Sequence, residues 1–287
     1  MTTAENCRAR VRKLLSMDQC VHPGSVFDPL SARIAEDLGF ETGMFAGSTA
    51  SLTVLGAPDI IVLTLSEFAA QCRRICRAGA LPLLVDADHG YGNAMNVQRT
   101  VQELENAGVS ALTIEDTTLP QTYGDKGPAM LSIDEGVGKM RAALSGRSDK
   151  RLVIAGRTSA AQLSDINDAI ARCQAYESVG VDMLMLVGIE TRADLEKLSA
   201  ATHLPLMLGS LSPELKDKRY LASHRVRIAL QGHQPLMAGV EAVYQTLKAL
   251  RDGISPADLL GIADKERMAK VTRKKRYDRE TREFLEL

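Results

Sequence analysis

Two aspartates stand almost side by side where an apolar run ends. The segment LLVDADHGYGN places Asp86 and Asp88 at the end of a short strand-like stretch. Residues two apart on a strand face the same side, so these two charges would repel each other or force one pKa upward. A divalent cation removes this conflict, and carboxylate oxygens favour Mg2+ or Mn2+ over zinc. The spacing therefore predicts a hard-metal site in which Asp86 is a direct ligand.

Other polar side chains also follow apolar runs. Glu115 follows an apolar run within TIEDT, Arg157 closes RLVIAGR, and Ser48 lies in the small-residue loop AGSTAS. A guanidinium at the end of a buried strand needs a planar anionic partner. That partner is either a structural carboxylate such as Glu115 or the carboxylate of a substrate. The first interpretation gives Arg157 a structural role, and the second gives it a role in substrate binding.

Three further residues in such positions have simpler explanations. His233 follows the last apolar run, and a lone histidine is more often a hydrogen-bonded structural residue than a catalytic one. Asp28 and Asp116 each follow a strand-like run, where an aspartate commonly forms a turn or caps a helix N-terminus.

The elements that must position these residues alternate along the chain. Short apolar runs are separated by longer amphipathic segments, and the runs are apolar throughout, as expected for parallel strands buried on both faces. Successive βα units predict an α/β fold, a (β/α)8 TIM-type barrel rather than an open sheet. In such a barrel the strand ends meet at one mouth. The eight candidate strands are residues 21 to 27, 42 to 46, 81 to 85, 110 to 114, 151 to 156, 183 to 187, 204 to 208 and 226 to 230.

Composition bounds the rest of the architecture. A chain of 287 residues with 45% hydrophobic residues can bury one large core, so we expect a single barrel domain over residues 1–287, with an N-terminal helix. Residues 254–287 read as a helical tail that packs on the barrel or on a neighbouring subunit. The basic cluster at 273–276 has acidic neighbours, which favours a solvated helix face over a nucleic-acid patch.

The net charge of -1 provides no long-range field for nucleic acid or an anionic membrane, so a small molecule is the expected partner. Five cysteines, an odd number without a CxxC pair, indicate reduced thiols rather than a disulfide framework. No run reaches the length of a membrane span, and the N-terminus lacks a signal-like apolar core. We therefore expect a cytoplasmic protein.

Several motifs together resemble the isocitrate lyase and phosphoenolpyruvate mutase superfamily, most closely its oxaloacetate decarboxylase branch. They are SVFDPLSARIAEDLGF, AGSTAS, DADHGYGN followed by TIEDT, IAGRTSA and QGHQ, in order over about residues 20 to 250. The resemblance implies a (β/α)8 barrel whose Mg2+ is held by Asp86, with water-mediated help from Asp88 and Glu115. It also implies substrate contacts from Ser48, Arg157 and His233.

The resemblance further implies a homodimer or homotetramer whose subunits exchange the last barrel helix. It also implies Mg2+-dependent decarboxylation of oxaloacetate, a 2-keto dicarboxylate, to pyruvate and CO2. Arg157 and His233 would then be the catalytic residues. An alternative is a carbon-carbon lyase for a 2-methylisocitrate-like or alkylmalate substrate. The loop LPQTYGDKGP lacks the cysteine such lyases use, so Tyr123 would have to replace that acid. A second alternative is a binder of dicarboxylates that turns nothing over.

Overall fold

The computed structural model describes residues 2–124 and 126–286. The chain divides into two compact units, Met1–Gly232 and His233–Leu287, and each is described by itself. Asp125, which belongs to the loop that carries Tyr123, lies outside the described residues. Within the described ranges, no helix combines the length and apolar character needed to cross a bilayer.

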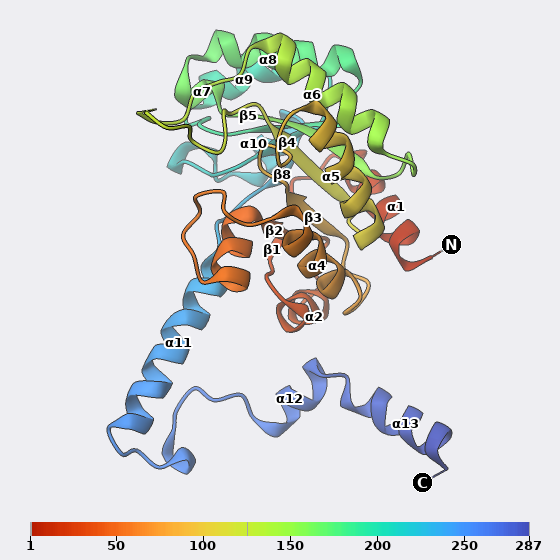
Figure 1. The fold of residues 1–287 in the computed structure, drawn as a ribbon, viewed down its shortest axis with the longest axis vertical. Helices are drawn as coiled ribbons and strands as arrows, with labels where there is room; N and C mark the ends of the chain where they lie inside the picture. The colour runs from red at the N-terminus through yellow and green to blue at the C-terminus, as the bar shows by residue number, and fades with distance from the viewer. Residues whose placement is uncertain (1, 125, 287) are drawn as a thin grey trace. The chain divides into compact units, whose positions relative to one another are not determined.

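The first unit is built on eight parallel strands that pair in chain order, from β1 to β8 (Figure 1). A parallel bridge between Val21 and Ile228 joins the segment before β1 to β8, with backbone hydrogen bonds of 3.0 Å on both sides. This bridge brings the first and last strands together and confirms the predicted barrel. The strands are β1 (Gly24–Ser25), β2 (Gly43–Ala46), β3 (Leu83–Asp86), β4 (Ala111–Glu115), β5 (Val153–Thr158), β6 (Met183–Leu186), β7 (Leu206–Leu208) and β8 (Val226–Ala229).

Helices follow the strands and cover the outer face of the sheet (Figure 1). Most begin with a side-chain cap, and Asp28 caps α2 through the Ser31 amide at 2.7 Å, as predicted. The helices of this unit are α1 (Thr3–Leu15), α2 (Pro29–Asp37), α3 (Gly47–Ala50), α4 (Leu65–Cys76), α5 (Ala94–Ala107), α6 (Ile133–Gly146), α7 (Ala160–Leu163), α8 (Ile166–Val179), α9 (Arg192–Ala201) and α10 (Lys218–Ser223).

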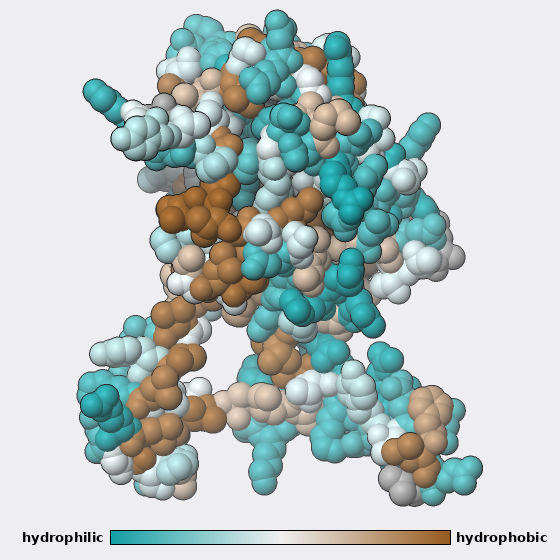
Figure 2. Space-filling view, in the orientation of Figure 1, coloured by the Kyte–Doolittle hydropathy of each residue, from teal (hydrophilic) through white to brown (hydrophobic). Residues whose placement is uncertain are grey.

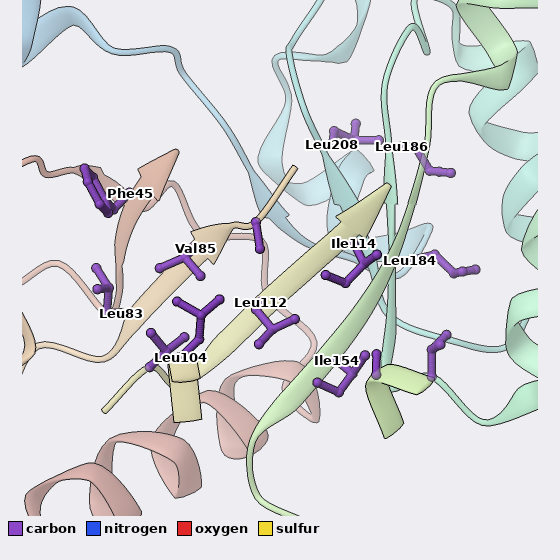
Figure 3. Packing of buried hydrophobic residues seen from close by; sticks show 14 of the residues in the cluster. Phe45, Leu83, Val85, Leu104, Leu112, Ile114, Ile154, Leu184, Leu186 and Leu208 are labelled. Carbon is purple, nitrogen blue, oxygen red and sulfur yellow. The ribbon is translucent and has the colours of Figure 1, made fainter. Parts of the chain in front are cut away.

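Strand alternation divides the core into two layers. Leu83 and Val85 on β3 point outward toward the helices with the other buried residues of Figure 3, whereas Leu84 points into the barrel. Because the strands run in parallel, this alternation continues around the sheet, and α1 adds its own apolar residues to the inner layer. The inward positions at the carboxyl ends of the strands are therefore where polar side chains can face one another.

The second unit contains α11 (Gln234–Arg251), α12 (Lys265–Val271) and α13 (Lys274–Leu285). Figure 2 shows apolar side chains gathered along α11, where Val240, Val243, Tyr244 and Leu247 are each about 60% exposed. These positions recur at helical spacing, so they form one apolar face. On α13, an i,i+4 pair joins Lys274 to Asp278 at 2.7 Å, so the basic cluster contacts one of its acidic neighbours.

Candidate active site at the barrel mouth

Three of the predicted site residues lie at the carboxyl ends of neighbouring strands. Asp86 is the last residue of β3, Glu115 is the last residue of β4, and Arg157 lies in β5. Glu115 and Arg157 are partners in the register of β4 and β5. All three occupy inward-facing positions, so parallel pairing brings together residues that are up to 71 positions apart in sequence.

Arg157 bridges the two carboxylates. Its Nη1 donates to Asp86 Oδ2 at 2.5 Å, and its Nη2 lies 3.1 Å from Glu115 Oε2. Thr113 donates its hydroxyl to the other Asp86 oxygen at 2.7 Å, and Thr117 donates to Glu115 at 3.2 Å. The anionic partner predicted for Arg157 therefore includes the structural carboxylate Glu115. The Nε of Arg157 is buried and has no hydrogen-bond partner within the described residues.

Asp88 follows β3 in a strained loop. Its φ is 48° and that of Tyr91 is 61°, left-handed values that non-glycine residues seldom adopt. The Asp88 amide donates to Asp86 Oδ1 at 3.3 Å, and the Asp88 carbonyl accepts the Glu115 amide at 2.9 Å. These two bonds hold the loop against β3 and β4 and so position Asp88 beside Asp86 and Glu115.

The small-residue loop predicted to approach a ligand contacts Asp88. A Cβ added to Gly47, the first residue of α3, would lie 2.2 Å from Asp88 Oδ2. Only glycine permits this approach of the backbone to the carboxylate. Ser48 is the next residue and is half-buried. The structure thus brings the Ser48 loop next to the acidic cluster.

The cluster carries more negative than positive charge. Three carboxylates, those of Asp86, Asp88 and Glu115, surround one guanidinium, which leaves two negative charges uncompensated when all are ionised. Burial and then the charges of Asp86 and Glu115 raise the pKa of Asp88 well above its ordinary value. Burial raises the pKa of Glu115 to about 7, although Arg157 acts in the opposite direction. The folded protein therefore stores electrostatic repulsion at this mouth.

A hard divalent cation fits this site in charge and donor type. Every candidate ligand is a carboxylate oxygen, and a charge of two would neutralise the excess. In the described ranges, however, no three Asp, Glu, His or Cys side chains are arranged as a ready-made metal site. Arg157 instead occupies the space between Asp86 and Glu115. A metal that bound here would share Asp86 with this guanidinium.

Two further residues of the sequence-based interpretation are His233 and Tyr123. His233 is the first residue of the second unit and stands at the N-terminus of α11, so its role at the mouth stays a prediction. Tyr123 is fully exposed on the loop between β4 and α6. The structure does not bring its hydroxyl to the carboxylates, which argues against Tyr123 as the acid of a lyase.

The interpretation of Asp116 as a turn former or cap is wrong. Asp116 is fully buried, accepts the Tyr176 hydroxyl at 2.5 Å, and pairs with Arg172 at 3.1 Å. Both partners come from α8, so this network ties β4 to the helix behind it. A Cβ at Gly156 would lie 3.0 Å from the Tyr176 ring, so the glycine beside Arg157 makes room for this tyrosine.

No local sequence signal identified Arg172 and Tyr176, because they are 56 and 60 residues away from Asp116. The network also supports the loop that carries Tyr123. The Asp116 carbonyl accepts the Leu131 amide at 2.8 Å, and so joins the two ends of that loop. Asp116 therefore positions a loop at the mouth from a buried site.

The chain is similar to known proteins over nearly its whole length. The family model for phosphoenolpyruvate phosphomutase matches residues 11–251. An oxaloacetate decarboxylase of Bradyrhizobium sp. (strain ORS 278) is 58% identical over 280 residues, which cover 98% of this chain and 97% of that protein. An oxaloacetate decarboxylase of Bradyrhizobium diazoefficiens is 59% identical over 266 residues, which cover 93% of this chain and 92% of that protein.

Solved structures show the same fold. A structure of oxaloacetate acetylhydrolase with its product oxalate has a TM-score of 0.84 and 27% identity, and the match covers 96% of this chain and 97% of that one. A structure of phosphonopyruvate hydrolase with oxalate and Mg2+ has a TM-score of 0.80 and 26% identity, and covers 98% of both chains.

Proposed function

The chain belongs to the phosphoenolpyruvate phosphomutase family, and on this basis we propose that it decarboxylates oxaloacetate to pyruvate and CO2 with a bound Mg2+. The observation that carries the proposal is the buried cluster of Asp86, Glu115 and Arg157 beside Asp88. Relatives at 58% and 59% identity are named for the same reaction. The phosphonopyruvate hydrolase of the same fold is a complex with oxalate and Mg2+, which supports the use of a divalent ion by this chain.

The reaction breaks the bond between C3 of oxaloacetate and its leaving carboxylate. The electron pair stays with C3 as an enolate, CO2 departs, and a proton added at C3 gives pyruvate. A divalent cation, when bound, supplies Lewis-acid stabilisation of the charge that develops on the 2-keto oxygen. Asp86 would hold it directly, with Asp88 and Glu115 acting through water, and Mn2+ is the alternative ion.

The protein's own groups handle the remaining charge. Arg157 is fixed by two carboxylates, and its guanidinium has five N–H donors, more than these two contacts use. We infer that Arg157 shares the anionic charge, because a preorganised donor in a buried site costs little reorganisation. Ser48 and its loop would orient the same end of the substrate. His233 would position the leaving carboxylate or assist the protonation at C3.

The exposed apolar face of α11 supports assembly into a homodimer or homotetramer. Val240, Val243, Tyr244 and Leu247 would be covered if α11 and the tail at 254–287 packed on a neighbouring subunit. We propose that copies of the chain exchange this helix. Light scattering on Leu247→Asp would report a smaller particle than the wild type, whereas an unchanged mass would contradict the exchange.

The five free cysteines support a cytoplasmic location.

The test is CO2 and pyruvate release from oxaloacetate, before and after the removal of divalent ions with EDTA. We expect activity to be lost on chelation, to return with Mg2+, and to stay absent in Asp86→Ala. Glyoxylate release from 2-methylisocitrate would instead identify the lyase alternative. Tight oxalate binding without turnover would identify a binder. Metal-dependent decarboxylation by Asp86→Ala at the wild-type rate would contradict the proposal.

A further inference from the structure

A second cavity lies at the amino-terminal end of β8, whereas the acidic cluster lies at the carboxyl ends of the strands. Its volume is about 590 Å³, and its lining includes Lys218, Arg219, Arg225 and Arg227. Arg225 directly precedes β8 and Arg227 lies near its start. In α/β barrels this end normally serves stability rather than chemistry, so a concentration of cations here needs its own explanation.

The cavity carries excess positive charge. Among its lining residues, four basic side chains face one acid, Asp18. Arg227 Nη2 pairs with Asp18 at 2.9 Å, but the Asp18 side chain is 97% exposed. Water screens a carboxylate that is so exposed, so it neutralises little of the field inside the cavity. Three positive charges are left without an acidic partner in the lining.

Two arginines at the cavity are fixed yet incompletely bonded. Arg227 is only 7% exposed, and its Nη1 donates to the Ala222 carbonyl at 2.9 Å. Arg225 Nη2 donates to the carbonyls of Ser199 and Thr202. In both side chains the Nε–H is buried without a hydrogen-bond partner among the described residues. A guanidinium has five N–H donors, and the bonds to carbonyls and to Asp18 use two of them in each side chain, so donors remain for an acceptor in the cavity.

We propose that this cavity binds a small molecule through a dianionic phosphate group, at a site separate from the barrel mouth. Two guanidinium groups held by backbone carbonyls offer donors in fixed directions, which suits an oxyanion with several acceptor oxygens. Lys218 and Arg219 also line the cavity, are exposed, and add positive charge. The chemistry is shared by free phosphate and by phosphate monoesters, and the experiment separates these two sources.

The experiment measures binding to the full-length protein by calorimetry, with inorganic phosphate and with glycerol 3-phosphate as probes. Each titration is run with and without saturating Mg2+ and oxalate, which occupy the proposed catalytic site. We expect binding of at least one probe to be unchanged by oxalate. The tighter probe identifies the source of the phosphate group. Binding that oxalate abolishes would place the anion at the barrel mouth and overturn the proposal.

The variants test the residues. Lys218→Ala combined with Arg219→Ala removes two exposed charges without disturbing a buried bond, and should weaken phosphate binding by roughly tenfold or more. Lys150→Ala removes an exposed charge elsewhere in the same unit and should leave the affinity unchanged. Arg227→Gln should abolish binding in protein that circular dichroism shows to be folded. Wild-type affinity in the double variant, or no binding of either probe to the wild type, would refute the site.

Discussion

Replacing Arg157 by lysine keeps the positive charge but removes the fork that reaches two carboxylates at once. The guanidinium contacts Asp86 at 2.5 Å through Nη1 and Glu115 at 3.1 Å through Nη2. A lysine ammonium is a single point charge and cannot reproduce both contacts in this geometry. The loss of one hydrogen bond to a charged group is worth about 1.5–3 kcal/mol. If that loss falls on the transition state, kcat/KM drops by roughly 10- to 150-fold.

The assay is initial-rate pyruvate formation at saturating Mg2+, with the unfolding temperature measured on the same samples. Arg151→Lys is the matched control, because Arg151 also bridges two carboxylates, Asp149 at 2.8 Å and Glu5 at 2.8 Å, and belongs to no part of the proposed site. We expect Arg151→Lys to retain the wild-type kcat/KM. If Arg157→Lys does so too, the guanidinium is not required and the mechanism drawn from its geometry is refuted.

Three further predictions concern hydrogen-bonded and charged groups of the first unit, two of them near the mouth and one before β5. Tyr176→Phe removes the 2.5 Å bond to the fully buried Asp116 and should lower the free energy of unfolding by about 1.5–3 kcal/mol in urea denaturation. Tyr220→Phe is the control, because the Tyr220 hydroxyl bonds the more exposed Glu196, and it should change the free energy of unfolding by less than about 0.5 kcal/mol. Equal effects of the two variants would contradict the role given to burial. Asp88→Asn removes one of the uncompensated negative charges, so it should raise the unfolding temperature measured without metal. The increase in unfolding temperature on adding Mg2+ should then be smaller than in the wild type. An undiminished Mg2+ effect would exclude Asp88 from the metal site. Burial opposes ionisation of Asp149, but hydrogen bonds from Arg151 and Arg8 lower its pKa below the ordinary 3.8. The stability that Asp149 contributes is therefore present above pH 3.8 and is lost as the pH falls through the lower folded-state pKa. Asp149→Asn should flatten this part of the curve of unfolding temperature against pH, and an unchanged curve would show that another group is responsible.

The sequence by itself determined the barrel and the residues of its mouth. Apolar runs that do not alternate are typical of parallel strands buried on both faces, and each of the eight predicted runs overlaps a strand of the structure. Because parallel strands end at a common edge, Asp86, Glu115 and Arg157, which close three of the runs, are expected to lie close together. This inference needs only strand order, which local pattern supplies.

Tertiary structure alone decided how the meeting residues pair. Arg157 bridges Asp86 and Glu115 because of the register of three strands, and the Asp116 network depends on α8 packing behind β4. The cationic cavity joins the chain before β1 to α10 and β8. Such contacts link residues tens to hundreds of positions apart, and no periodicity in the sequence encodes them. Periodicity states which face a side chain occupies, while the closure of the barrel determines what lies opposite it.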